Sequence, residues 1–265
     1  MFILAQRNKM KITFISDTHT KHHQVTSQLP GGDLLIHAGD LMNSGYNKKE
    51  INHFCEWFES QDYKHKIFIA GNHDKMFEDH PLESNTIVNG YDVTYLQDKE
   101  VLIDGIKIYG SPWQPEFYNW AFNLPKNGTE LKQKWSQIPI GTDILITHGP
   151  PYGHLDTVVG QYNNLGCKML SERIEVVKPK IHVFGHIHSG YGYKFENGTH
   201  YINAAVLGAL DLGLTAYNGF YAANVKDNIA NKEKAVKVLK AIAAGIQSGV
   251  DPVSGDSEVL TNPLI

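Results

Sequence analysis

The fold prediction rests on the stretch Ile67-Phe68-Ile69-Ala70-Gly71-Asn72-His73-Asp74. Its four apolar residues predict a short buried strand, and this strand runs directly into a turn that carries an amide, an imidazole and a carboxylate. Asn72 offers a neutral oxygen ligand, and His73 can carry a proton near neutral pH. Asp74 can orient that imidazole or stabilise its charge. The turn therefore combines metal-binding and acid–base groups at one strand end.

The same pattern follows four other apolar runs that predict strands, at residues 11–16, 33–38, 143–147 and 181–184. In α/β sheets, ligands gather at the carboxyl ends of the strands. Strands alternate with helices early in the chain, which predicts a partly parallel sheet. Five apolar runs that each end in metal-type side chains are hard to attribute to core packing alone. The metal-type side chains that follow these runs are Asp17, His19, Asp40, His148, His186 and His188.

Together with Asn72, this set has too many ligands for one tetrahedral zinc ion. It suits two adjacent cations that share a carboxylate. Two cations about 3.5–4 Å apart can hold both the attacking and the leaving oxygen of an in-line displacement. The set therefore predicts two divalent metal ions and phosphoester hydrolysis. Imidazole suits Mn²⁺, Fe or Zn²⁺ better than Mg²⁺ alone, and we expect Mn²⁺ first.

The motifs resemble, in this order, the signature of the calcineurin-like metallophosphoesterase superfamily. The resemblance covers roughly residues 11–205. The segments 108–113, 147–151 and 183–188 resemble more narrowly the subfamily of brain-expressed animal metallophosphoesterases and their bacterial relatives. The signature parts are Asp17-x-His19, Gly39-Asp40, Gly71-Asn72-His73-Asp74, His148 and Gly185-His186-x-His188.

This resemblance implies an α/β fold of two mixed β-sheets packed as a sandwich and flanked by helices, in four αββα layers. It also implies a role for each site residue. A metal-bridging hydroxide would attack phosphorus in line, and His73, assisted by Asp74, would protonate the leaving oxygen or stabilise the transition state. The first metal would be held by Asp17, His19, Asp40 and His188, and the second by the bridging Asp40 with Asn72, His148 and His186.

The substrate is predicted less directly. The aromatic segment Ser111–Trp135 is interpreted mainly as a cover for one sheet end, with Trp113 and Asn123 as the candidates for substrate contact. The leading hypothesis is a phosphodiesterase for small phosphodiesters such as nucleotides or cyclic nucleotides. The alternatives are a phosphomonoesterase, including a protein phosphatase, and a non-catalytic scaffold that keeps the fold for protein binding.

Composition limits the partners. The 265 residues carry a net charge of −4, so no global basic field attracts a nucleic-acid polymer or an acidic membrane. A nuclease would need a basic track along the site. The two cysteines, Cys55 and Cys167, predict no disulfide framework, and no apolar run suits a signal peptide or a membrane span. The expected partner is a small phosphoester, and the expected compartment is the cytoplasm.

Two units are expected: a metallophosphoesterase domain at 1–226, and a C-terminal helix with a mobile tail at 227–265. Residues 1–9 are interpreted as an extra arm before Met10. The tail helix, predicted over Asn231–Gln247, would pack on its own domain or on a partner chain, so a homodimer is possible. Further helices are expected at 47–58 and 167–177, and a hairpin at 101–110. Residues 75–100 are interpreted as a mixed, polar stretch with Pro81 and Asn89-Gly90 as breakers. The histidines interpreted as ordinary surface residues are His22, His53, His65, His80 and His200, whereas His182 is expected in the core or at a sheet edge.

Overall fold

The computed structural model describes residues 10–158, 163–206, 220–223 and 239–241. Its helices are α1 (Lys48–Glu59), α2 (Lys75–Asp79), α3 (Pro81–Val88), α4 (Thr129–Ser136), α5 (Lys168–Val177) and the 3-10 helices η1 (His22–Gln28) and η2 (His188–Gly190). Its strands are β1 (Lys11–Ile15), β2 (Gly32–His37), β3 (Tyr63–Phe68), β4 (Thr94–Tyr95), β5 (Lys99–Ile103), β6 (Ile106–Ser111), β7 (Gln114–Pro115), β8 (Asn123–Leu124), β9 (Ile144–Thr147), β10 (Ile181–Phe184), β11 (Gly192–Glu196), β12 (Thr199–Asn203), β13 (Phe220–Ala223) and β14 (Leu239–Ala241).

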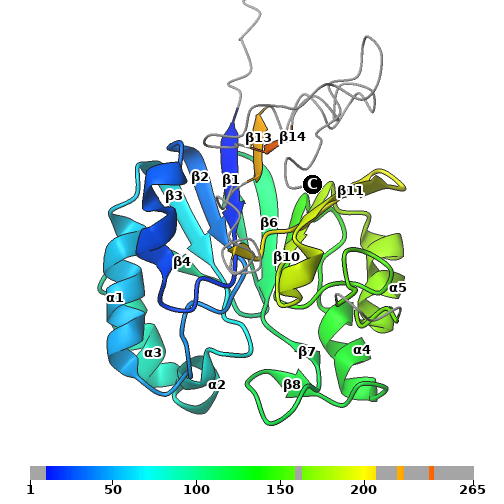
Figure 1. The fold of residues 1–265 in the computed structure, drawn as a ribbon. Coiled ribbons are helices and arrows are strands. Elements are labelled where there is room, and N and C mark those ends of the chain that lie inside the picture. Colours follow the sequence, from blue (N-terminus) through cyan, green and yellow to red (C-terminus); the bar gives the residue numbers. More distant parts are fainter. Residues whose placement is uncertain (1–9, 159–162, 207–219, 224–238, 242–265) are drawn as a thin grey trace, which may run out of the picture.

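Two mixed sheets form the centre of the molecule (Figure 1). The first has the strand order β14-β13-β1-β2-β3-β4, in which β1 to β4 are parallel and β13 runs antiparallel to β1. The second has the order β11-β12-β10-β9-β6-β5, with parallel strands inside and antiparallel strands at both edges. Parallel strands end at the same edge of their sheet, and the loops that carry the site start there.

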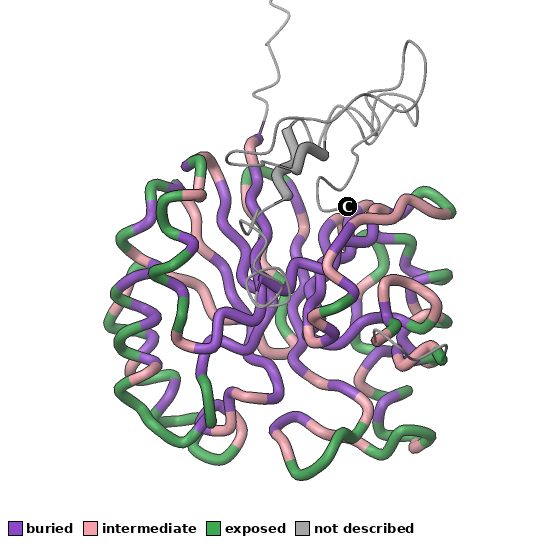
Figure 2. The backbone as a smooth tube through the Cα atoms, in the orientation of Figure 1, coloured by how far each residue is buried: buried purple, intermediate pink, exposed green. Residues whose placement is uncertain are grey.

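Alternate residues of the facing strands build the core between the two sheets. Phe14 of β1 and Ile146 of β9 both lie buried in this layer. Because strand side chains alternate, the remaining apolar residues face outward to the helices. Leu35 of β2 packs in the layer that contains α1, and Leu145 of β9 packs in the layer that contains α4 and α5. Buried strands thus lie between helices whose outer faces are exposed (Figure 2), which confirms the predicted αββα sandwich.

Helix α1 shows why local sequence patterns can predict a helix well. Asn47 caps the helix, because its side chain accepts a hydrogen bond from the Lys49 amide at 3.1 Å. Ile51, Phe54 and Phe58 form the buried stripe expected from their spacing. The helix begins and ends one residue later than predicted. The hairpin of β5 and β6 is confirmed in the same way.

Other segments differ from the predictions. The mixed stretch 75–100 contains α2 and α3, and Pro81 begins α3 rather than ending a helix, because a first-turn residue needs no amide donor. The expected helix over 231–247 is wrong at Leu239–Ala241, which form strand β14 and pair with β13; the rest of that segment lies outside the described residues, as does the arm at 1–9. No described helix is long and apolar enough to cross a membrane.

Candidate metal centre

The seven predicted ligands lie in loops that follow β1, β2, β3, β9 and β10, and the structure brings all seven together. Several of these residues have left-handed backbone conformations, which cost a non-glycine residue energy. The φ angles are 55° at Asp17, 40° at His19, 59° at Asp40 and 65° at His186. Such strain persists only where the surroundings enforce it, and it is concentrated at functional sites. The loops are therefore folded around the position of these side chains.

One group of donor atoms surrounds Asp17. His188 Nε2 lies 3.3 Å from Asp17 Oδ1, and the Asp17, His19 and His188 ligand atoms all lie within 4.8 Å of one another. His19 Nε2 also lies 3.6 Å from Asp40 Oδ2. This group corresponds to the first of the two metal positions that the sequence implied.

A second group surrounds Asn72. Its Oδ1 lies 2.8 Å from His148 Nε2 and 2.7 Å from His186 Nδ1. His148 Nε2 also lies 3.3 Å from Asp40 Oδ2, so Asp40 lies between the two groups. Because Asp40 contacts a histidine of each group, its carboxylate is placed to bridge two ions. The ligand assignments themselves remain predictions.

Two glycines allow this crowding. A Cβ atom on Gly71 would lie 2.3 Å from Asp40 Oδ1, and one on Gly185 would lie 2.0 Å from Asp17 Oδ2. Both distances are too short for any side chain. The glycines that precede Asn72 and His186 are therefore needed so that the backbone can approach the ligand carboxylates closely.

Two of the predicted ligand histidines are held by hydrogen bonds on the ring nitrogen that faces away from the cluster. His148 Nδ1–H donates to the Ala38 carbonyl at 3.0 Å, and His19 Nδ1–H donates to the Met42 carbonyl at 3.2 Å. Each bond fixes the ring so that Nε2 faces the cluster, as is usual for metal ligands. His19 Nε2 is buried without a hydrogen-bond partner. An unpartnered nitrogen among carboxylate and imidazole donors fits a site for divalent cations.

The ionisation of the clustered carboxyl and imidazole groups also indicates a site for divalent cations. Burial opposes ionisation of Asp17 and Asp40, but the facing imidazoles of His188 and His148 hold the pKa values of both carboxyls below their usual range. Burial disfavours the imidazolium of His148, yet Asp40 raises its pKa to about 9. Within the described residues, neither carboxylate has a Lys or Arg partner among the ion pairs. Two buried carboxylates whose ion-pair partners in this part of the chain are imidazoles alone favour bound cations.

His73 lies at the rim of the cluster. Its ring stacks on Trp120 with centroids 4.0 Å apart and meets the His19 ring edge-on at 4.5 Å. Its Nδ1 is hydrogen-bonded to the Asn43 carbonyl oxygen. The ring is therefore held beside the first donor group with its position fixed on two sides.

Asp74 lies away from the place expected for an orienting group. Its Oδ2 accepts hydrogen bonds from the Gly71 amide at 2.6 Å and the Asp40 amide at 2.9 Å, and its Oδ1 accepts from the Met42 amide at 2.8 Å. The His73 ring instead uses the Asn43 carbonyl. Burial, with a further contribution from Asp40, raises the pKa of Asp74 to about 8 against the opposing effect of these amides. Asp74 thus joins the loops after β2 and β3, and any direct help to His73 remains a prediction.

A cavity of about 640 Å³ opens beside the cluster, and His186 and His188 are part of its wall. Phe117 and Tyr118 line the same cavity, and the Phe117 ring meets His186 edge-on at 5.6 Å. Together with Trp120, these aromatic residues were missed as site residues. Their segment, Ser111–Trp135, was noted as aromatic-rich, but the sequence could not show which of its rings face the ligands.

The two residues predicted to contact substrate have partners within the protein, and their contact with substrate stays a prediction. Trp113 Nε1–H donates to Asp98 at 2.9 Å, and Lys134 Nζ lies 4.3 Å from the centre of the Trp113 ring. Asn123 closes its own loop, since its side chain donates to the Tyr118 carbonyl at 2.8 Å and accepts from the Phe117 amide at 3.3 Å. Asn123 therefore helps to shape the loop that presents Phe117 and Tyr118.

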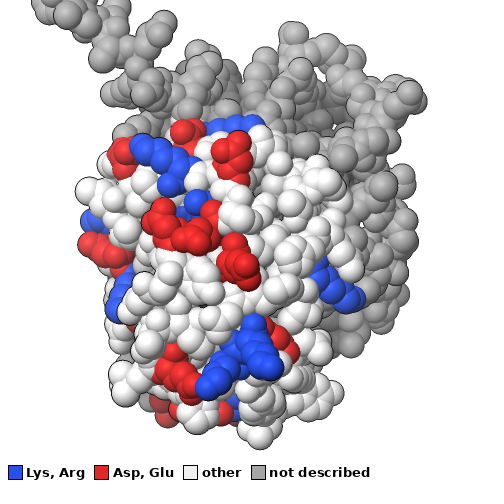
Figure 3. Space-filling model, turned by 90° about the vertical axis from the view of Figure 1, so that its left-hand side faces the viewer, with Lys and Arg blue, Asp and Glu red and all other residues white. Residues whose placement is uncertain are grey.

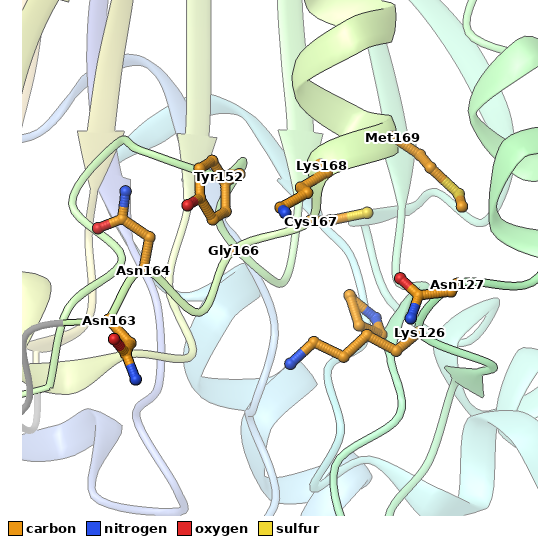
Figure 4. Close-up of a pocket in the computed structure, with 10 residues that line it drawn as sticks. Lys126, Asn127, Tyr152, Asn163, Asn164, Gly166, Cys167, Lys168 and Met169 are labelled. Atoms are coloured by element: carbon orange, nitrogen blue, oxygen red, sulfur yellow. The ribbon is translucent and has the colours of Figure 1, made fainter.

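A second cavity of about 580 Å³ adjoins the first (Figure 4). The two share Lys126, Gly166 and Cys167 in their walls. The second cavity also contains Lys168 and Asn164 but none of the metal-type ligands. Chemistry at a metal pair therefore belongs to the first cavity, and the second offers polar and cationic groups next to it.

The fold and the donor cluster define an αββα protein with candidate metal ligands gathered at the strand ends. A family model described as calcineurin-like phosphoesterase matches residues 10–190. Human metallophosphoesterase domain-containing protein 1 is 44% identical over 214 residues, which cover 72% of this chain and 64% of that protein. The chain therefore belongs to the calcineurin-like phosphoesterase family, and the family prediction is confirmed.

A further relative and a solved structure also match the chain. A Caenorhabditis elegans UPF0046 protein is 39% identical over 216 residues, which cover 75% of this chain and 76% of that protein. The crystal structure of a Thermus thermophilus protein matches with a TM-score of 0.56 at 14% identity, covering 83% of this chain and 96% of that one. At this identity the structural match supports the fold alone. This chain spans less than two thirds of the length of its human relative.

Proposed function

We propose that this protein is a dinuclear metal-dependent phosphodiesterase that hydrolyses small phosphodiesters, with nucleotides and cyclic nucleotides as the leading candidates. The observation that carries the proposal is the position of the donor cluster. It lies on the wall of a cavity and has an aromatic side chain at each end, Phe117 against His186 and Trp120 against His73.

The metal ligands form two sets that share one carboxylate. Asp17, His19 and His188 would hold the first ion, Asn72, His148 and His186 would hold the second, and Asp40 would serve both. The chemistry that bound divalent cations would supply is polarisation of the phosphoryl oxygens and a lower pKa for the attacking water. The mixture of imidazole and carboxylate donors favours Mn²⁺, with Fe and Zn²⁺ as alternatives.

His73 is the proton donor to the leaving oxygen. Its Nδ1 is bound to the Asn43 carbonyl, which leaves Nε2 free for proton exchange with a substrate. Stacking on Trp120 and the edge contact with His19 fix the direction of the ring. General acid catalysis requires this kind of fixed position within hydrogen-bonding reach of the leaving atom.

The preference for a diester follows from the two aromatic ends. A phosphodiester carries an organic group on each side of phosphorus, whereas a monoester carries only one. A volume of about 640 Å³ is in the usual range for small-molecule sites, and Lys126 in the same wall can pair with a phosphate. A base stacked on Phe117 or Tyr118 would use their exposed rings.

The surface charge favours a small substrate over a polymer. On the face that carries α1 and α3, acidic and basic side chains are mixed (Figure 3). The net charge of −4 provides no global attraction for a polyanion. We therefore propose no nucleic-acid polymer as substrate.

The test compares a chromogenic phosphodiester with the matching phosphomonoester. Chelator-treated protein is assayed after addition of Mn²⁺, Zn²⁺ or Mg²⁺, with Asp40→Asn as the control that removes the bridging carboxylate. We expect Mn²⁺ to restore cleavage of the diester in the native protein but not in the control. A panel of cyclic and linear nucleotides then identifies the substrate class.

Two outcomes would contradict the proposal. Cleavage of the monoester alone would indicate a phosphomonoesterase. No cleavage by protein that demonstrably binds two metal ions would indicate a scaffold that keeps the fold without turnover.

A further inference from the structure

A cluster of three histidines lies away from the proposed phosphoesterase centre. His22 and His23 begin η1, and His53 lies in α1, which packs beside η1 (Figure 1). The ring centroids are separated by 4.7 Å for His22–His23, 4.9 Å for His22–His53 and 4.7 Å for His23–His53. The three rings thus form a nearly equilateral triangle.

His22 is the unusual member of the cluster. The sequence suggested an ordinary surface histidine, but its side chain is fully buried, with 0% of its surface exposed. Neither of its ring nitrogens has a hydrogen-bond partner. Buried polar atoms normally find partners, because an unmade hydrogen bond is costly. The His22 ring therefore has the property expected of a metal ligand.

The packing holds His22 in place for such a role. Its ring lies 4.8 Å from the Trp57 ring and 5.8 Å from the Phe54 ring, both on α1. Burial lowers the pKa of His22 to about 3, so the imidazole is neutral at physiological pH. A neutral imidazole is the form that binds metals. His23 and His53 are exposed, so an ion can reach the cluster from solvent.

We propose that His22, His23 and His53 form a separate zinc site that binds one ion, with water as the fourth ligand. One potential ligand nitrogen from each ring lies within 4.8 Å of the other two. His23 Nε2 and His53 Nε2 are already 3.0 Å apart. Two imidazole nitrogens on one tetrahedral zinc would be about 3.3 Å apart, given zinc–nitrogen bonds of about 2.0–2.1 Å. Only small movements separate the cluster from that geometry.

The zinc ion would join η1 to α1. Helix η1 begins three residues after His19, so this link would hold the end of the loop that carries Asp17 and His19. The role is structural, and it does not depend on the proposed phosphodiesterase activity.

The test counts bound zinc by elemental analysis after equilibrium dialysis of the untagged full chain. The native protein is compared with a His23→Gln/His53→Gln double variant and with His80→Gln, which removes an exposed histidine at the start of α3. We expect the double variant to bind one zinc ion fewer per chain and His80→Gln to match the native protein. Both substituted side chains are exposed, so the circular dichroism spectrum should stay unchanged.

Thermal unfolding gives a second readout that does not involve catalysis. Zinc should raise the Tm of the native protein more than that of the double variant, because the ion binds the folded state. Equal zinc counts in the native protein and the double variant would overturn the proposal, whatever the outcome of the hydrolysis assays. If the native protein hydrolyses neither ester but still binds one zinc ion more than the double variant, only the proposed function is contradicted.

Discussion

At the scale of single residues, His73 is distinguished from the ligand histidines by its surroundings. It lies at the rim, where its ring stacks on Trp120 and meets the edge of the His19 ring, and its backbone amide donates to Asp40 Oδ1 at 2.7 Å. The sequence placed His73 at the strand end, but it could not show that Asn43 rather than Asp74 holds the ring. That partner comes from another loop, and its identity depends on how the loops pack.

The substitution His73→Ala should lower kcat by about 10²–10⁴-fold, because it removes a general acid. Metal content and the free energy of unfolding should change little, since the ring is a rim group whose side-chain hydrogen bond goes to one carbonyl. Steady-state kinetics with the diester, together with metal analysis, measure both effects. His80→Ala, at an exposed position, is the matched control.

Turnover by His73→Ala at the native rate would show that His73 does not transfer the proton. A loss of bound metal would instead place His73 among the ligands. Its ligand atom lies within 4.8 Å of those of His19 and Asp40, so the metal analysis separates these two roles.

At the scale of elements, the important feature is the junction between each parallel strand and its loop. Gly185 follows β10 and Gly149 follows β9, so the two glycines lie at the ends of neighbouring strands. An added Cβ at Gly185 would meet Asp17 Oδ2 at 2.0 Å, whereas one at Gly149 would meet its nearest neighbour, Gln114 Cβ, at an ordinary 3.5 Å. Only the first junction leaves no room for a side chain.

The substitution Gly185→Ala should weaken metal binding by at least about 10-fold, because Asp17 must move away from its position beside His188. Gly149→Ala is the control and should bind metal like the native protein. Isothermal titration with Mn²⁺ measures both. Equal affinities in the two variants would show that Asp17 does not need its present position.

The elements also show where sequence patterns succeed. Helix α1 was predictable because its cap and its buried stripe are local features. Helix α3 was missed because Pro81 was interpreted as a breaker although it occupies the first turn. Strand β14 was missed because the apolar spacing of its own segment suggested a helix. A strand is stabilised by pairing with a neighbour, and the neighbour here, β13, lies elsewhere in the chain.

At the scale of the whole molecule, the sandwich buries polar groups that titrate. His182 in β10 is fully buried, and its Nε2 bonds with Thr147 Oγ1 at 2.8 Å. Burial lowers its pKa well below the usual value, with a small contribution from His154. Burial likewise lowers the pKa of His37 to about 3. Both imidazoles therefore bind a proton less readily in the folded protein than in the unfolded chain.

Because the unfolded chain binds these protons near pH 6.5 and the folded protein does not, each buried histidine makes stability fall as the pH drops below about 6.5. His182 should contribute up to about 2 kcal/mol of this loss between pH 7.5 and pH 5. The variant His182→Gln should therefore lose less stability over that interval than the native protein. Urea unfolding at both pH values measures the difference.

His80→Gln serves as the control for that comparison, since His80 is exposed and should leave the pH dependence unchanged. The same loss of stability in His182→Gln and in the native protein would show that His182 titrates normally in the folded state.

The sequence by itself determined the family, the αββα fold class, and which side chains follow each parallel strand. The strand-end side chains follow from apolar runs, glycines and ligand pairs, which are local patterns, whereas the family and the fold class follow from the resemblance of these motifs to a known family. It also predicted that the seven candidate ligands share one site, since parallel strands end at the same sheet edge, but these strands belong to two sheets whose ends meet only in the tertiary structure.

Only the tertiary structure decided which groups from different loops meet. It placed Asp40 between the two donor groups and Asp74 on the backbone amides of Asp40 and Met42. It also turned Trp120 toward His73, and it buried His22 against α1 beside His53. Each of these contacts joins residues that are distant in sequence, and its existence depends on packing between layers, which no local pattern encodes.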